Sequence, residues 1–200
     1  INNAKSDPNK VKLVYHGIDT DLFKLVPGIQ RIDLVVSVGN INEENLYRKG
    51  LLHFVGSAKY LPDVQYLLIG KFIEPEAVRQ IKNIAPSNVR FIDGIYGNDL
   101  VKVFCDAKVY VQASICESFA CSMAEAMLCE CIPVVSKFAA LPEVVGEAGI
   151  YIDNLNPEGI AEKIKQALQH PELKVMARER IENEFSLKKR AQGMLNYVDE

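Results

Sequence analysis

Short apolar runs rich in β-branched residues alternate with segments of helical periodicity along most of this chain. The runs occupy residues 11–15, 34–38, 66–69, 89–92, 109–112, 132–136 and 150–152. Most are continuous rather than alternating, as expected for strands that are covered on both faces. The helical segments between them lie near residues 47–60, 74–85, 98–106, 118–129 and 141–146. This order predicts an α/β fold with a Rossmann-like, doubly wound parallel sheet.

After residue 152 the pattern predicts helices only, over residues 157–169, 171–183 and 187–197. We therefore expect one domain over residues 1–200, with the sheet in about 1–152 and a helical tail in 153–200. A length of 200 residues and 48% hydrophobic residues suit a single domain with a full core. Because the chain starts without methionine on a polar stretch, we expect it to be a piece of a longer protein.

Charge and cysteine content exclude several classes of protein. A net charge of −3 provides no general attraction to polyanions, so nucleic acid is not an expected partner. The five cysteines match neither a disulfide framework nor a zinc spacing, and we interpret them as small buried apolar residues in a reducing compartment. Neither a signal peptide nor an apolar stretch of membrane-spanning length is evident, which favours a cytoplasmic location.

Glycine, lysine and short polar residues gather in the predicted turns from strand to helix. In sheets of this kind, ligands bind outside the carboxyl ends of the strands, where helix N-termini present unpaired N–H groups. These turns are residues 39–49, 70–71, 94–97, 114–121 and 137–140. We therefore expect the binding site at this edge of the sheet.

The most informative turn contains Glu117, with Glu125 eight residues later on the predicted helix. Two helical turns separate such carboxylates by about 12 Å, so a ligand that touches both must be long. A nucleotide sugar fits, with Glu117 on the sugar, Glu125 on the ribose and the N–H groups of residues 118–121 near the diphosphate. Taken alone, Glu125 is typical of an exposed helix surface, and Glu117 is typical of an acid in the first turn of a helix, where it complements the helix dipole.

Other catalytic patterns are missing from the sequence. His16, His53 and His170 are scattered, and neither a Ser-His-Asp set nor a nucleophile elbow occurs. The spacing from Gly39 to Lys49 does not match a P-loop, and no GxGxxG follows the first strands. The ATPase and dehydrogenase classes are therefore disfavoured.

Several spaced motifs together resemble the carboxy-terminal domain of retaining glycosyltransferases of family 4. They are His16-Gly17-Ile18-Asp19 with Phe23, Val38-Gly39, Lys49-Gly50, Val89-Arg90-Phe91 with Gly94, Ser114-x-x-Glu117-x-Phe119, Glu125-Ala126-Met127, Pro133-Val134-Val135 and Leu141-Pro142-Glu143-Val144-Val145. They fall in the family's order and cover nearly the whole chain. The resemblance implies one half of a GT-B fold, in which two Rossmann-like domains face each other across a cleft. This chain matches only the donor-binding half, so the amino-terminal acceptor domain is expected to be absent from it.

The resemblance also implies an activity. In this family a hexose passes from a nucleotide diphosphate sugar, here a UDP-, GDP- or ADP-sugar, to an acceptor hydroxyl with retention and without a metal or other cofactor. The expected partners are the donor, the missing acceptor domain and a glycan or lipid-linked acceptor. The isolated chain is expected to be inactive, and the full-length enzyme to be cytoplasmic or peripheral to the membrane.

Residue roles carried over from the family fall into two groups. Lys49, which neutralises the departing diphosphate, and Glu117 are the expected catalytic residues. The expected donor-binding residues are Gly39, Asn40, Gly94, Ile95, Ser118, Phe119, Ala120, Cys121, Glu125 and Lys137.

The sequence departs from the family pattern at positions that contact the donor. Asn40 replaces an arginine that follows Val-Gly, and an amide cannot supply the charged fork of a guanidinium. We rank Lys137 first, Lys71 second and Arg48 third as the substitute cation. The family's glycines are also replaced, by Ser118, Ala120, Glu130 and Ala139-Ala140, which restricts the backbone there.

Two alternatives remain open at this point. One is a sugar-nucleotide 2-epimerase of similar architecture. The other is a degenerate, non-catalytic GT-B module, which the loss of arginine at Asn40 favours.

Overall fold

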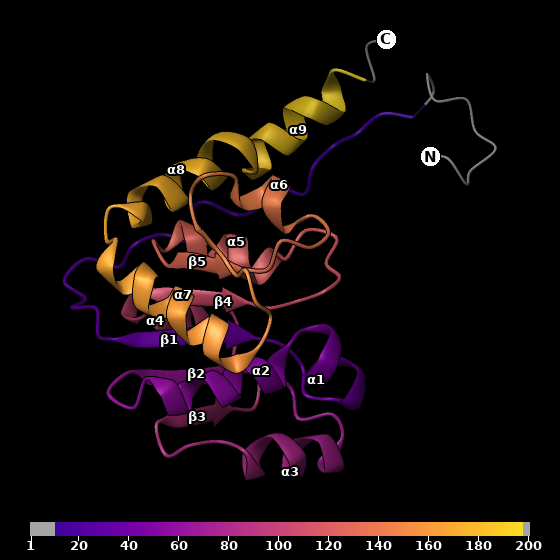
Figure 1. Cartoon of the computed structure of the whole chain (residues 1–200). Coiled ribbons are helices and arrows are strands. Elements are labelled where there is room, and N and C mark those ends of the chain that lie inside the picture. Colours follow the sequence, from indigo (N-terminus) through magenta and orange to yellow (C-terminus); the bar gives the residue numbers. More distant parts are fainter. Residues whose placement is uncertain (1–10, 198–200) are drawn as a thin grey trace.

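One six-stranded parallel sheet forms the centre of the computed structural model, which describes residues 11–197. The strands follow the order β3-β2-β1-β4-β5-β6, and every neighbouring pair is parallel. They are β1 (Leu34–Val38), β2 (Gln65–Ile69), β3 (Val89–Ile92), β4 (Val109–Gln112), β5 (Ile132–Val135) and β6 (Ile150–Tyr151). The predicted doubly wound fold is confirmed, and the strand order reverses between β1 and β4 (Figure 1).

Helices connect the strands and follow the last one. They are α1 (Glu43–Arg48), α2 (Leu51–Ser57), the short 3-10 helix η2 (Ala58–Tyr60), α3 (Pro75–Asn83), α4 (Gly97–Asp106), α5 (Cys121–Leu128), α6 (Leu141–Val145), α7 (Pro157–Gln169), α8 (Leu173–Glu184) and α9 (Leu187–Leu195). Pro157 follows the N-cap Asn156, whose side chain accepts a hydrogen bond from the Gly159 N–H, so α7 begins where its first unpaired N–H groups are satisfied.

Alternate residues of each strand point to opposite faces of the sheet, and both faces are covered. Val36, Leu67 and Tyr110 pack with α4, α5 and α8 on one face. Val35, Leu68 and Val111 pack with α2, α3 and α7 on the other. Because α7 and α8 contribute buried residues to opposite faces, they complete the core, and Figure 1 shows α7 lying across the strands.

The prediction of a strand at residues 11–15 is wrong. This segment has no strand partner within residues 11–197, and it runs beside α9 in Figure 1. Main-chain hydrogen bonds join the chain to the carboxy-terminal helices at Ile18, whose N–H donates to the Phe185 carbonyl at 2.7 Å and whose carbonyl accepts from the Leu187 N–H at 3.0 Å. Of the apolar residues that suggested a strand, Tyr15 packs its ring on Phe185 at the end of α8, whereas Val11 and Leu13 are exposed.

Two predicted helices differ at their boundaries because of left-handed backbone. The helix expected over residues 47–60 is divided into α1 and α2 at Gly50, where φ is 64°. The helix expected from residue 118 begins at Cys121, because its N-cap Ala120 has φ of 67°. Residues 118–120 therefore form a loop, which widens the turn that carries Glu117.

Positive φ angles occur at three of the five positions where the sequence resemblance leads us to expect a glycine. Among the described residues, the non-glycine residues with positive φ are Ala120, Glu130 and Ala139. The backbone has thus kept the conformation that glycine adopts freely, although each side chain makes it less favourable by about 1–2 kcal/mol.

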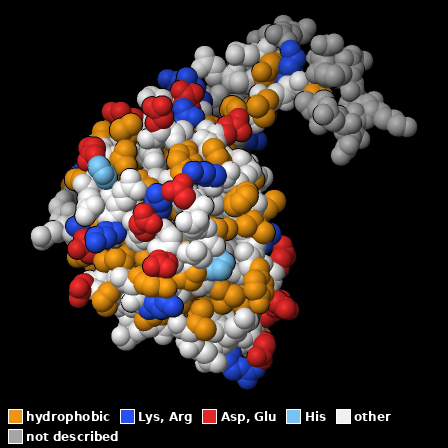
Figure 2. Space-filling model, viewed as in Figure 1, with side chains coloured by type: hydrophobic (Ala, Val, Ile, Leu, Met, Phe, Trp, Pro, Cys, Tyr) orange, Lys and Arg blue, Asp and Glu red, His pale blue; other side chains and the backbone are white. Residues whose placement is uncertain are grey.

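Positive and negative side chains are interspersed on the face seen in Figure 2, without a large patch of one sign. Cys105, Cys129 and Cys131 are buried as predicted, whereas Cys121 is half-buried and Cys116 is exposed. Within residues 11–197, none of the helices combines the length and the apolar character that a bilayer crossing requires.

Candidate active site

A cavity of about 640 Å³ opens at the carboxyl end of the sheet, close to the reversal of strand order. Ligands of doubly wound folds bind at this place. Half of the twelve residues predicted for the site line it. These are Lys49, Glu117, Ser118, Phe119, Ala120 and Cys121.

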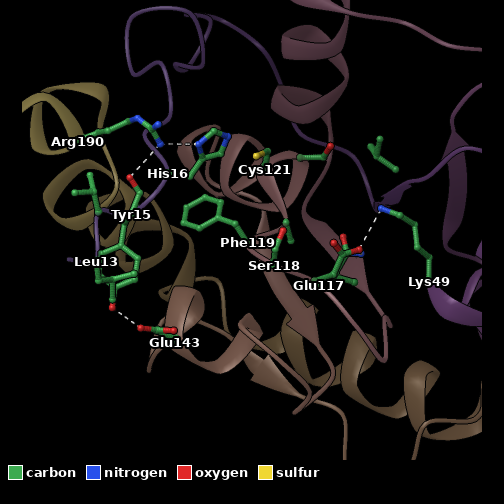
Figure 3. A pocket seen from close by; sticks show the side chains of 15 residues that line it. Leu13, Tyr15, His16, Lys49, Glu117, Ser118, Phe119, Cys121, Glu143 and Arg190 are labelled. Carbon is green, nitrogen blue, oxygen red and sulfur yellow. Dashed lines mark hydrogen bonds and ion pairs between the residues drawn. The ribbon is translucent and has the colours of Figure 1, made fainter. Parts of the chain in front are cut away.

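The two predicted catalytic residues form an ion pair at one end of the cavity (Figure 3). The Lys49 Nζ lies 3.1 Å from the Glu117 Oε1, and the side chains are 22% and 12% exposed. Partial burial lowers the local dielectric constant, so this pair is held more firmly than an exposed one. Its remaining surface faces the cavity.

Buried polar side chains form hydrogen bonds to the carboxylate of Glu117. The Gln112 Nε2 donates to the Glu117 Oε1 at 3.2 Å, and the Ser114 Oγ donates to the same oxygen at 3.1 Å. The Tyr110 hydroxyl donates to the Gln112 Oε1 at 3.1 Å. With Lys49 included, Oε1 accepts from three donors, whereas Oε2 has no partner among the described residues.

Lys49 is positioned by the break between α1 and α2. Its N–H donates to the Asn45 carbonyl at the end of α1, and Gly50 then turns the chain into α2. A Cβ at Gly39 would lie 3.1 Å from the Lys49 Cδ, so the end of β1 packs directly against the lysine stem. The side chain is therefore directed along the carboxyl edge of the sheet toward Glu117.

Glu125 lies on α5, outside the residues that line the cavity. Its carboxyl is half-buried, and desolvation raises the pKa of Glu125 above its ordinary value. The carboxylate of Glu125 makes no hydrogen bond or ion pair within residues 11–197. Burial, followed by the charge of Glu125, likewise raises the pKa of the Cys121 thiol at the cavity, which favours the neutral thiol.

Gly39, Asn40, Gly94 and Ile95 lie at the neighbouring strand ends rather than in the cavity. The Asn40 Oδ1 accepts from the Lys71 N–H at 3.1 Å, so Asn40 joins the loops that follow β1 and β2. A Cβ at Gly94 would lie 3.6 Å from the Lys71 Cγ. These residues thus continue the same edge of the sheet beyond Lys49.

The three cations proposed as substitutes for the missing arginine all lie outside the cavity lining. Lys137, ranked first, binds Asp153 with its Nζ 2.6 Å from Oδ1. Arg48 donates to the Cys116 carbonyl at 3.2 Å and to the Asn45 Oδ1 at 2.7 Å, so it supports the loop before Glu117. Lys71 is exposed and has no ion-pair partner among the described residues.

Several residues that sequence reasoning did not assign to the site complete the cavity. Gln112 and Ser122 belong to the same turn and follow from its geometry. Tyr15 and His16 come from the extended segment beside α9, and Glu143 from α6. Arg190 comes from α9, and no local pattern marks it. Within residues 11–197, no three His, Cys, Asp or Glu side chains converge as a metal site requires, and a reaction without metal stays a prediction.

A family model described as "Glycosyl transferases group 1" matches residues 33–170, which include Lys49, Glu117 and Glu125. The chain belongs to the glycosyl transferases group 1 family. A curated member, alpha-maltose-1-phosphate synthase from Mycolicibacterium smegmatis, is 28% identical over 90% of this chain and 54% of its own length. The chain therefore spans about half the length of this relative.

Two solved structures share the fold of this chain. An Anabaena protein in complex with UDP-glucose superposes with a TM-score of 0.83 at 18% identity, over 98% of this chain and 59% of its own. A carboxy-terminal domain of a glycosyl transferase group 1 protein from Francisella tularensis superposes with a TM-score of 0.68 at 20% identity, over 86% of this chain and 100% of its own.

Proposed function

We propose that this glycosyl transferase group 1 chain binds a nucleotide diphosphate sugar in the cavity and serves as the donor-binding half of a retaining hexosyltransferase. The Lys49–Glu117 pair carries the proposal, because it joins a cation and a partly unused carboxylate at the carboxyl end of the sheet. The Anabaena structure with UDP-glucose supports the class of donor.

Glu117 is arranged to bind vicinal sugar hydroxyls. The protein occupies one carboxylate oxygen with Lys49, Gln112 and Ser114, which fixes the plane of the group. The second oxygen remains for hydroxyls of the sugar, and hydrogen bonds to a charged acceptor are the stronger kind. The same contacts hold the carboxylate in place before the ligand arrives, so little reorganisation is needed.

Lys49 and the start of α5 suit the diphosphate. The ammonium has three donors and uses one on Glu117, so it can also contact the leaving group as negative charge grows there. Ala120, Cys121 and Ser122 at the helix N-terminus line the same cavity. Unpaired N–H groups and the helix dipole favour anions at such a place.

Glu125 takes the ribose in this proposal. Its half-buried carboxyl has no partner within residues 11–197, so two ribose hydroxyls would replace the hydration that it lacks. Glu117→Gln is expected to weaken binding of the nucleotide sugar, whereas Glu125→Gln weakens binding of the nucleoside diphosphate as well.

Titration calorimetry with UDP, GDP, ADP and their glucose or mannose derivatives tests these roles on both variants. The exposed Glu162→Gln on α7 is the matched control. A thermal-shift screen comes first, because a ligand at a hundred times its Kd stabilises the protein by about 2.7 kcal/mol. Equal losses for all ligands in both glutamate variants would contradict the assignment.

The length of a relative supports a proposal about the whole protein. Because the chain covers about half of the curated relative's length, we propose that a second domain carries the acceptor, a glycan or a lipid-linked sugar. The 200-residue chain should then bind the donor without transferring the sugar. Turnover by the chain alone at the rate of the full-length enzyme would contradict this division.

A non-catalytic module is the second candidate, and Asn40 favours it. The Asn40 amide accepts from the Lys71 N–H and belongs to the loop, so it supplies no charge to a diphosphate. A full-length protein that binds UDP and neither transfers nor epimerises the sugar would support this alternative.

A further inference from the structure

The cavity contains a second cation, Arg190, that the roles proposed above leave unused. It lies on α9 and is half-buried. Its Nη1 donates to the Tyr15 carbonyl at 3.3 Å and to the His16 Nδ1 at 3.0 Å. These contacts hold the guanidinium against the extended segment that forms the outer wall of the cavity.

No carboxylate among the described residues pairs with Arg190. The two acids of the cavity are engaged elsewhere, Glu117 with Lys49 and Glu143 with the Tyr15 hydroxyl. The Arg190 Nε and Nη2 have no partner within residues 11–197. Three of the five N–H donors of this guanidinium are therefore available to a ligand.

His16 adds a donor of fixed direction. Arginine only donates, so the His16 Nδ1 accepts and the hydrogen of the neutral ring is on Nε2. The ring packs edge-to-face on Phe119 with centroids 5.6 Å apart, and Phe119 packs in the same manner on Phe185 at 5.3 Å. The imidazole cannot turn freely, so its Nε2–H keeps one orientation.

Gly17 allows this arrangement by its lack of a side chain. A Cβ there would lie 2.9 Å from the Arg190 Cβ and 2.9 Å from the Leu187 Cα. In Figure 3, Arg190 and His16 stand well apart from Lys49 and Glu117, with Phe119 and Ser118 between them. The guanidinium therefore faces a different part of the ligand from the group at Lys49.

We propose that Arg190 and the Nε2–H of His16 bind a phosphate group at the end of the cavity away from Lys49. A guanidinium fork matches two oxygens of a phosphate, and its charge is not neutralised in the described chain. The inference deepens the proposed function and rests on it. The phosphate belongs either to the donor's diphosphate or to a phosphorylated acceptor.

Calorimetry on the chain with two probes, UDP and a hexose 1-phosphate, distinguishes the two sources. Arg190→Gln should weaken binding of one probe by about tenfold or more, as expected when a charge-assisted contact is lost. A loss of affinity for UDP would show that Arg190 binds the donor's diphosphate. A loss of affinity for the hexose 1-phosphate, with the affinity for UDP unchanged, would show that it binds the phosphate of an acceptor. Lys189→Gln, the exposed neighbour on α9, should leave both affinities unchanged.

Arg190→Lys tests the geometry, since it retains the charge and loses the fork, and it should recover only part of the affinity. If the variants fold poorly, the Arg190 Nε–H signal of 15N-labelled wild-type protein should still shift on addition of the probe. Wild-type affinity of Arg190→Gln for both probes, or an unshifted signal at saturation, would overturn the inference. A wild-type chain that binds the hexose 1-phosphate through Arg190 and does not bind UDP would instead refute the proposed function.

Discussion

Gly50 packs against the main chain of Ala113 so closely that a Cβ at Gly50 would lie 2.4 Å from the Ala113 carbonyl oxygen. This contact joins the start of α2 to the end of β4, and it places Lys49 beside the loop that carries Glu117. The left-handed φ of 64° at Gly50 is a second reason for glycine at this position.

Gly50→Ala should therefore reduce both stability and donor binding. The left-handed conformation alone costs a side chain about 1–2 kcal/mol. The contact with Ala113 should add roughly 1–3 kcal/mol, and moving Lys49 should weaken UDP binding. Urea unfolding and calorimetry measure the two effects. Gly28→Ala is the control, because Gly28 has φ of 82° with nothing within 4 Å of its Cβ position. A loss no larger than that of Gly28→Ala would show that Ala113 can move away.

Ala139→Gly should stabilise the protein by roughly 0.5–1 kcal/mol, because the relief of a side chain at positive φ outweighs the cost of the freedom that glycine adds to the unfolded chain. Ala139 is exposed, with φ of 53°, so little packing is lost. Its neighbour Ala140 has φ of −80°, and Ala140→Gly should destabilise the protein instead. Chemical unfolding of both variants checks the opposite signs. Equal effects at the two positions would contradict the explanation.

Gln112→Leu should remove one hydrogen bond that positions Glu117. It should therefore reduce the affinity for the nucleotide sugar more than the affinity for the nucleoside diphosphate. It should also destabilise the protein by about 1–3 kcal/mol, because the buried Tyr110 hydroxyl loses its acceptor. Ser37→Ala is the matched control. It removes a buried hydrogen bond from the Ser37 Oγ to the Val111 carbonyl without touching Glu117. If both variants keep the wild-type affinity for the nucleotide sugar, Gln112 does not position Glu117.

Glu125→Gln should stabilise the protein at neutral pH while it weakens ligand binding. Desolvation raises the folded-state pKa of Glu125 above its unfolded value, so its ionisation opposes folding. The stability of the wild type then falls as the pH rises from the pKa of Glu125 in the unfolded chain, about 4.5, through its higher pKa in the folded protein. The advantage of Glu125→Gln should be larger at pH 7 than at pH 4 in urea titrations, with the exposed Glu162→Gln as the reference for the loss of one carboxylate. A stability difference between Glu125→Gln and the wild type that increases as the pH falls would contradict this prediction.

Most strands, and their order along the chain, can be predicted from the sequence. A parallel sheet that is covered on both faces requires continuous β-branched runs such as 109–112 and 132–135. Residues 11–15 have the same composition and are not a strand, since strand formation also needs a partner with free main-chain groups. The helix expected over residues 47–60 is divided at Gly50, which has a left-handed backbone conformation. The sequence does not reveal this break, because the apolar residues on both sides of Gly50 continue one helical periodicity.

The candidate site follows from the sequence only where its residues share one turn. Glu117, Ser118 and Phe119 lie together in sequence and in space, and Lys49 joins them because the first and fourth strands are neighbours. Arg190 could not be found, because its place depends on how α9 packs on a segment about 175 residues earlier in the chain. Lys137 lies outside the cavity lining, where its charge is paired with Asp153 from the loop after β6, and its part in donor binding stays a prediction.

The pairing of Ile18 with Phe185 and Leu187 has a mechanical consequence. Tyr15 and His16 on one side of it and Arg190 on the other form a single wall that is anchored at this pair of main-chain hydrogen bonds. While these hydrogen bonds persist, the early segment cannot move relative to the sheet without carrying α9 along. Any movement of this wall over a ligand would then change the width of the cavity and the position of the Arg190 charge together.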